Sequence, residues 1–337
     1  MVTTGRGSGE SVNIDNLLQL LTYMTSKVHS TLWWLLERIY RVYVGISMSV
    51  LSRFDYGTNV YEQHWDVLVI LDTARLDAME EVAHGFEFIN DVGSIRSIGS
   101  TSSEWIAKTF TEMYSQEISN TILVSANPHV QHTLYDRKFP EHDKDAFFAF
   151  TDWKTVAPNT FELIEQPWKY ATNERYDHVL PKDMTERAVS LYREHDPERM
   201  IVHYMPPHRP HIATAYEEGR DLTNAERDPF SYLKNGGDRD TVFSNHVADL
   251  KFVLETGVEP LLRNIDADTV AITADHGDGF GKNWCYAHIA GDPRKQVRRV
   301  PWIKTEATDH DELESKLTPP ESTEDSTEDQ LEALGYL

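Results

Sequence analysis

Carboxylates and histidines follow three apolar runs of this 337-residue chain, at the points where the runs end. Asp72 follows VLVIL, Asp275 and His276 follow TVAITA, and the segment after MIVHYM contains His208 and His211. Mixed oxygen and imidazole donors suit Mn, Zn or Mg, and Ca where oxygen predominates. A divalent ion bound by Asp72, Asp275 and His276 would act as a Lewis acid on a phosphoryl or sulfuryl oxygen and would lower the pKa of a bound hydroxyl.

A hydroxyl-rich segment, GSTSSEW from Gly99 to Trp105, precedes a stretch with helical periodicity. A hydroxyl at a helix N-terminus lies where the partial positive charge of the helix end favours an anionic group. Ser100, Thr101 and Ser102 are therefore candidate nucleophiles. Serine and threonine also cap helices, and the Ser-x-Glu spacing is common in caps. Spacing alone leaves both interpretations open.

Four short β-branched runs predict the strands that position these side chains, and helical patterns lie between them. The runs span residues 67–71, 121–126, 200–205 and 269–274, and the helical patterns span 74–82, 103–114, 184–194 and 241–264. Continuous apolar runs suit strands that are buried on both faces. The alternation predicts an α/β fold with a mainly parallel sheet and helices on both faces. In such sheets the ligand site lies outside the carboxyl ends of the strands. His203, inside one run, is expected to pack in the core.

Several motifs resemble one family. VLVILDTARLDAM is similar to the first metal-binding segment of sulfatases and related hydrolases of the alkaline phosphatase superfamily, and ITADHGDGFG is similar to their second. MPPHRPH resembles their substrate-side histidine segment, while AHIAGDPRKQVRRVPWI and LEALGYL resemble later stretches. The arrangement is closest to sulfatase-like proteins of halophilic archaea. The resemblance covers roughly residues 60–305 and the C-terminus.

This resemblance implies an alkaline phosphatase-like fold and a metal-dependent enzyme that hydrolyses or transfers phosphate or sulfate esters. It implies the following roles: Asp72, Asp275 and His276 as metal ligands, Thr101 as the nucleophile, and His208 and His288 as contacts of the transferred group or leaving oxygen. Ser100 and Ser102 are the other hydroxyls at the nucleophile position, and His211 is expected at most to line the cleft.

The chain departs from the sulfatase pattern in two places. Thr73 stands where many sulfatases have a second aspartate, and no Cys-x-Pro-x-Arg motif is present for conversion to formylglycine. A hydroxyl nucleophile, as in phosphatases and phosphoethanolamine transferases, is therefore expected. Two alternatives stay open: a catalytically degenerate binding protein on the same fold, and a membrane-associated transferase of phospho groups in surface glycan or lipid synthesis.

The charge balance limits the partners of the chain. Its formal net charge is −23, with 55 Asp and Glu against 32 Lys and Arg. A field of this sign repels nucleic acid phosphates, so no nucleic acid partner is expected. A small-molecule, glycan or lipid ester is the expected substrate. Acidic residues scattered along the whole sequence also predict adaptation to concentrated salt.

Composition and pattern predict three parts: a leader and helical segment (1–58), a catalytic domain (59–306), and an acidic linker with a docking C-terminus (307–337). Residues 129–183 are expected to form insertions around the site. Residues 28–51 are apolar but interrupted by Glu37, Arg38 and Arg41, so they suit a helix packed on the domain or one lying in a membrane interface. Without a secretory signal pattern, a cytoplasmic location is expected, peripheral at the inner membrane face if that helix binds lipid.

Overall fold

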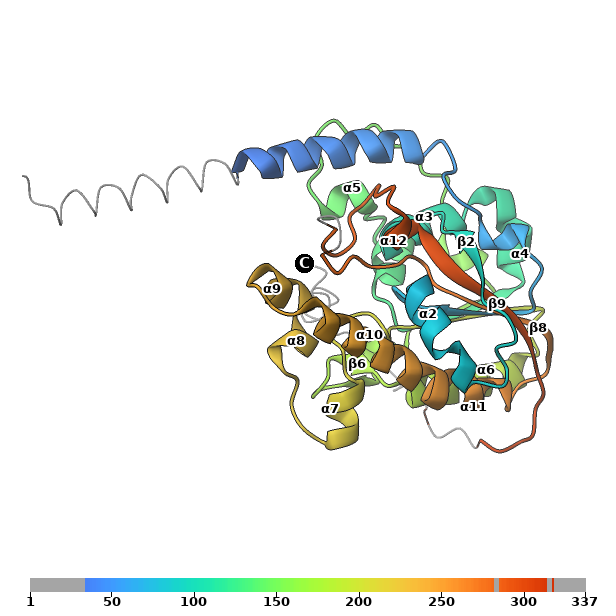
Figure 1. Ribbon diagram of the computed structural model, residues 1–337. Helices are drawn as coiled ribbons and strands as arrows, with labels where there is room; N and C mark the ends of the chain where they lie inside the picture. The colour runs from blue at the N-terminus through green and yellow to red at the C-terminus, as the bar shows by residue number, and fades with distance from the viewer. Residues whose placement is uncertain (1–33, 282–284, 314–316, 318–337) are drawn as a thin grey trace, which may run out of the picture.

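One seven-stranded sheet organises the computed structural model, which describes residues 34–281, 285–313 and 317 (Figure 1). The strands, in spatial order, are β2 (Gly93–Arg96), β9 (Arg299–Ala307), β8 (Ala267–Thr273), β1 (Val67–Leu71), β7 (Arg199–Tyr204), β3 (Thr121–Ser125) and β4 (Leu163–Glu165). The five strands from β8 to β4 are mutually parallel, whereas β9 runs antiparallel to both of its neighbours. The predicted mainly parallel α/β sheet is confirmed.

Helices cover both faces of this sheet because successive residues of its buried strands point in opposite directions. In β1, Val69 and Leu71 belong to one apolar core, while Leu68 and Ile70 belong to a second. The first core includes α2 (Leu76–Val82), α6 (Pro181–His195), α10 (Arg239–Val253) and α11 (Glu259–Leu262). The second includes residues of α3 (Ser102–Thr109) and α4 (Ser115–Ser119). The predicted two-faced helical cover is therefore also confirmed.

Short elements occupy the connections. The α-helical ones are α5 (Pro140–Asp143), α7 (Ala213–Glu218), α8 (Asn224–Arg227), α9 (Pro229–Lys234) and α12 (Lys295–Arg298). The π-helical turns are η4 (Gln131–Tyr135) and η7 (Leu254–Val258), and the 3₁₀ turns are η1 (Val60–Glu62), η2 (Ala83–Gly85), η3 (Glu112–Tyr114), η5 (Pro158–Thr160) and η6 (Pro167–Lys169). A separate two-stranded ribbon pairs β5 (Thr172–Asn173) with β6 (His178–Val179).

All four predicted strands are present, but the sequence pattern missed the three other strands of the main sheet and the β5–β6 ribbon. β4 is three residues long and only partly buried, so it has no continuous apolar run. In β9 the exposed Lys304 and Glu306 interrupt the apolar pattern, and β2 has only intermediate and exposed residues. The predicted helix over residues 241–264 is divided at η7, where the α-helical hydrogen-bond pattern gives way to a π-helical turn.

A helix over residues 34–51 lies against the rest of the molecule near α5 (Figure 1). Its inner face contributes Val44 and Met48 to a small apolar cluster with Ala290, and the Tyr43 hydroxyl donates to the Gly291 carbonyl at 2.8 Å. One face of this helix thus packs on the main domain, which is one of the two arrangements expected from the sequence. Within the described residues, no helix combines the length and apolar character needed to cross a bilayer.

The predicted leader, the first part of the predicted helical segment and the docking segment after residue 317 lie outside the described residues. The division of the chain into three parts stays a prediction.

Candidate functional site

Asp72, Asp275 and His276 meet at the carboxyl edge of the sheet. Asp72 directly follows β1, and the other two follow β8, which pairs in parallel with β1. All three side chains are fully buried, and one potential ligand atom from each lies within 4.8 Å of the others. The strand-end argument brought these residues together correctly, because parallel neighbours end at the same edge.

The potential metal-ligand atoms of this cluster lie close to one another. Within the described residues, Asp72 Oδ1 and Asp275 Oδ2 accept no hydrogen bond. His276 Nδ1 donates to the Gly277 carbonyl at 3.0 Å, and its Nε2 lies 3.4 Å from Asp275 Oδ2. Burying a carboxylate oxygen without a hydrogen-bond partner or a counter-charge costs a large amount of free energy. A cation between these atoms would satisfy all of them, so the residues fit a divalent metal ion.

The electrostatics of the cluster also favour positive charge. Burial alone would lower the pKa of His276, but the Asp275 and Asp72 carboxylates outweigh it and raise that pKa above its ordinary value. Burial would raise the pKa of Asp275, but His276 and His203 outweigh it and lower the pKa. Both directions describe a site that keeps the Asp275 carboxylate ionised and attracts a cation.

Backbone groups hold Asp275 in place. Its Oδ1 accepts the amides of Thr73 at 3.2 Å and His276 at 2.8 Å, which leaves Oδ2 directed at the cluster. Thr73 adopts a left-handed backbone with φ of 61°, rare for a β-branched residue. The residue that departs from the sulfatase pattern therefore contributes its amide to the site, while its buried Oγ1 has no hydrogen-bond partner among the described residues.

Two residues beside Asp72 were not selected from the sequence as site residues. Asn127 Nδ2 donates to Asp72 Oδ2 at 2.6 Å, and His203 Nε2 lies 3.4 Å from the same oxygen. His203 is buried and packs edge-on to Trp105, as expected of a core residue, yet its polar edge faces the cluster. Asn127 follows the predicted strand at 121–126, so the strand-end rule applied there would have found it.

The three candidate hydroxyls have different surroundings. Ser102 Oγ lies 3.3 Å from Asp72 Oδ2 and 3.4 Å from His276 Nε2, at the first residue of α3. Thr101 is the N-cap of α3: its Oγ1 accepts the Glu104 amide at 3.2 Å and contacts Ser103 Oγ.

The third hydroxyl, Ser100 Oγ, donates to Glu104 Oε2 at 2.6 Å and accepts the Asp292 amide at 3.1 Å. Glu104 in turn pairs with the buried Arg298 at 2.6 Å. Among the three hydroxyls, only that of Ser102 contacts the metal-ligand cluster in the described structure.

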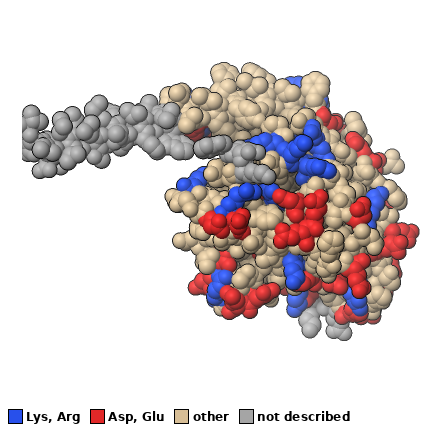
Figure 2. All heavy atoms as spheres, viewed as in Figure 1, with Lys and Arg blue, Asp and Glu red and all other residues tan. Residues whose placement is uncertain are grey.

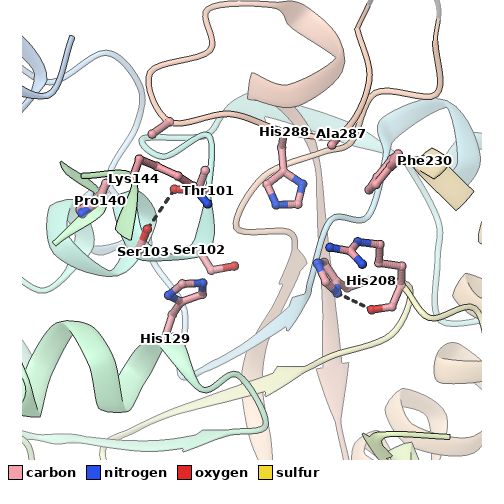
Figure 3. Close-up of a pocket in the computed structure, with 12 residues that line it drawn as sticks. Thr101, Ser102, Ser103, His129, Pro140, Lys144, His208, Phe230, Ala287 and His288 are labelled. Atoms are coloured by element: carbon pink, nitrogen blue, oxygen red, sulfur yellow. Dashed lines mark hydrogen bonds between the residues drawn. The ribbon is translucent and has the colours of Figure 1, made fainter. Parts of the chain in front are cut away.

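A cavity of about 130 Å³ opens beside this hydroxyl. Ser102 extends into it, and His129, His208 and His288 surround it from different segments (Figure 3). Lys144 and Arg209 also line it. Cationic and N–H-bearing side chains around a serine hydroxyl suit a small anionic group such as a phosphate or sulfate.

The two predicted substrate-side histidines lie together in this cavity, with ring centroids 5.8 Å apart. Burial, reinforced by Arg209 and His288, holds the pKa of His208 well below its ordinary value. Its Nδ1 donates to the Arg209 carbonyl at 2.6 Å, which leaves the Nε2 lone pair as an acceptor. The His288 ring is tilted against the His276 ring, with centroids 4.3 Å apart, and His288 Nδ1 contacts Asp278 Oδ1 at 3.3 Å.

His211 and Cys285 are not among the residues that line this cavity. His211 is buried and its Nδ1 contacts Asp249 Oδ2 at 3.1 Å, while the other Asp249 oxygen accepts the amides of Ile212 and Ala213. Burial raises the pKa of Cys285 to about 11, so the single thiol of the chain stays protonated near neutral pH.

No family model and no curated protein sequence matches the chain. Among solved structures, it is similar to the soluble domain of lipooligosaccharide phosphoethanolamine transferase A from Neisseria meningitidis (12% identity, 72% of this chain and 75% of that one, TM-score 0.48). It spans 47% of the corresponding integral membrane protein. Two further similarities are to the C-terminal periplasmic domain of EptC from Escherichia coli in complex with Zn (13%, 75% and 76%, 0.41) and to a 2-O GAG sulfatase (14%, 71% and 63%, 0.36). At these values the similarities decide nothing about what this chain binds.

Proposed function

We propose that this chain is a metal-dependent enzyme that transfers a phosphoryl or sulfuryl group from an ester to its own Ser102 hydroxyl. One observation carries the proposal: Ser102 Oγ lies between an Asp72 oxygen and His276 Nε2, beside two buried carboxylate oxygens that have no hydrogen-bond partner among the described residues. A nucleophile next to an unsatisfied anionic cluster is the arrangement that metal-assisted group transfer needs.

Asp72, Asp275 and His276 would hold the ion. When bound, it would supply Lewis-acid polarisation of the ester and a lowered pKa of the serine hydroxyl. Mn, Zn, Mg and Ca all remain candidates, because two carboxylates and one imidazole suit each of them. Asn127 and the Thr73 amide orient the two carboxylates from behind.

The residues of the chain provide the other parts of the reaction. Ser102 attacks the phosphorus or sulfur centre, and its proton passes to Asp72, whose Oδ2 already faces the hydroxyl. The bond from that centre to the leaving oxygen breaks, and the α3 N-terminus favours the negative charge of the transferred group. His208 and His288 line the opposite side of the cavity, where they can contact the leaving oxygen (Figure 3). An anionic substrate would raise the pKa of His208 and allow it to donate.

Thr101, the nucleophile implied by the family resemblance, stays the competing assignment. It lines the same cavity. Its hydroxyl, however, already caps α3, so attack by it would first release the Glu104 amide. The contacts of Ser102 with the ligand cluster support Ser102 instead.

The Asp275→Asn variant tests the metal assignment. The purified chain and the variant are compared with added Mn on nitrophenyl phosphate, a nitrophenyl phosphodiester and nitrophenyl sulfate. We expect the variant to lose metal binding in equilibrium dialysis and to lose turnover of whichever ester the chain accepts. Unchanged activity in the variant would overturn the metal site. A chain that binds no metal and turns over none of the esters would favour the degenerate binding protein.

The acceptor that discharges the serine intermediate decides between hydrolase and transferase. Water gives a hydrolase, and an acceptor alcohol gives a transferase. Product analysis with and without added glycerol separates the two. A cytoplasmic location stays a prediction that cell fractionation tests.

A further inference from the structure

The outer face of the helix over residues 34–51 is apolar and has no partner among the described residues. Its most exposed aliphatic side chains lie seven and four residues apart, with Ile39 57% exposed, Ile46 55% exposed and Val50 52% exposed. Residues at this spacing share one side of a helix. Since Val44 and Met48 fix the opposite side to the domain, the apolar stripe cannot turn inward.

A neighbouring loop extends the stripe into a broader surface. Phe148 and Phe150 are 68% and 72% exposed. The loop is pinned to the helix: the Phe150 amide donates to Ser49 Oγ at 2.7 Å, and Arg53 donates to the Phe150 carbonyl at 2.6 Å. Gly45 allows the close approach, because a Cβ there would lie 1.9 Å from the Phe147 carbonyl oxygen. We call this surface, formed by Leu35, Leu36, Ile39, Tyr43, Ile46, Val50, Phe54, Phe148 and Phe150, the apolar platform.

The charge around the platform differs from that of the chain as a whole. Residues 34–54 contain three arginines and one glutamate, in a chain with a net charge of −23. Arg38 stacks on Trp34 at 4.2 Å, while Arg41 pairs with Glu37 at 2.6 Å and lies 3.7 Å from Asp145. In Figure 2 the surface over this helix is mostly tan, whereas red and blue groups alternate over the body of the molecule. The platform therefore combines apolar side chains with little negative charge. On the visible face it is the surface best suited to contact with lipid.

We propose that the apolar platform lies in the headgroup region of a lipid bilayer, with the helix parallel to the membrane plane. An apolar face with aromatic side chains and flanking arginines is typical of interfacial helices. Pairing with a second copy through the helix would cover a narrow stripe and leave Phe148 and Phe150 in water. A bilayer covers the helix and the loop together, which accounts for both exposed segments.

The platform adjoins the candidate active site. Ala290 packs under the helix with Val44 and also lines the cavity beside Ser102. Pro140 and Lys144 line the same cavity, and Lys144 is exposed four residues before Phe148. Docking would thus place the cavity next to lipid headgroups. If the proposed function holds, an ester carried on a headgroup is within reach of Ser102, a consequence that rests on that function.

Flotation of the full chain with vesicles tests the docking without any need for activity. Vesicles of phosphatidylcholine, alone and mixed equally with phosphatidylglycerol, are compared in a density gradient. We expect the chain to float with both kinds of vesicle, because the apolar side chains of the platform carry the binding. Ile39→Gln and Ile46→Gln remove exposed apolar groups without opening the core, and each should weaken binding about ten-fold. Met113→Gln is the matched control, since Met113 is 78% exposed elsewhere and should not matter.

Three results would overturn the proposal. The first is a chain that floats with neither kind of vesicle. The second is flotation of the Ile39→Gln and Ile46→Gln variants that equals flotation of the unsubstituted chain. The third is a dimer in light scattering without lipid that both platform substitutions dissociate, because the platform would then be a subunit interface. Flotation without any esterase activity would leave the docking intact and count only against the proposed function.

Discussion

The hydroxyl of Ser102 lies 3.4 Å from Nε2 of His276, although these residues are 174 positions apart in the chain. The first residue of α3 and the residue three positions after β8 meet because α3 begins, and β8 ends, at the carboxyl edge of the sheet. This contact distinguishes Ser102 from its hydroxyl neighbours.

The first prediction compares Ser102→Ala with Thr101→Ala. We expect Ser102→Ala to reduce kcat by about a thousand-fold or more with little change in stability, because it removes the attacking oxygen. Thr101→Ala should lower the free energy of unfolding by about 1 kcal/mol through the lost helix cap and keep most of the activity. Steady-state kinetics and denaturant unfolding measure both. Activity retained in Ser102→Ala but lost in Thr101→Ala would return the nucleophile role to Thr101.

The second prediction concerns Asn127, which donates to Asp72 at 2.6 Å. Asn127→Leu has a similar shape but leaves Asp72 Oδ2 without this donor, so metal affinity should fall about ten- to hundred-fold. Equilibrium dialysis with Mn measures the change. Asn59→Leu is the control, because Asn59 is equally buried but caps the 3₁₀ turn η1. Equal metal affinity in the two variants would contradict the positioning role of Asn127.

The third prediction is a pH dependence of the metal-free protein. The pKa of His276 is raised in the folded state, so its contribution to stability is complete below its unfolded pKa of about 6.5 and is lost as the pH rises through the folded value. The pKa of His208 is lowered, so below about pH 6.5 the unfolded state takes up a proton that the folded state refuses, and stability falls with acid.

Urea unfolding across this range, with and without added metal, measures both effects. His276→Gln should flatten the alkaline side and His208→Gln the acidic side. Bound metal should abolish the alkaline loss, because it replaces the proton on His276. An alkaline slope that persists in His276→Gln would assign it to another group.

The fourth prediction concerns salt. Acidic residues outnumber basic ones by 55 to 32, so their mutual repulsion destabilises the folded chain at low ionic strength. Tm should rise steadily from low to molar KCl as this repulsion is screened. A Tm that falls over that range would count against salt adaptation.

Sequence pattern was sufficient for the elements that carry a simple repeat. Runs such as VLVIL are buried on both faces, so their strand character is visible locally, and each was found within two residues of its observed ends. β9 was missed because Lys304 and Glu306 interrupt it, and only pairing with β8 and β2 makes it a strand. Its position between them depends on contacts far along the chain, which no local pattern records.

The sequence by itself determined that Asp72, Asp275 and His276 would share one sheet edge, because parallel strands deliver whatever follows them to the same place. It could not choose among Ser100, Thr101 and Ser102, because adjacent residues at a helix start point in different directions. Only the tertiary structure shows that the Ser102 hydroxyl contacts Asp72 and His276, because the position of α3 relative to the sheet edge decides which hydroxyl faces the cluster. It also decided that one face of the helix over residues 34–51 packs inward and the other stays exposed, since both faces are apolar and only one of them packs against Ala290, Ala146 and Trp153.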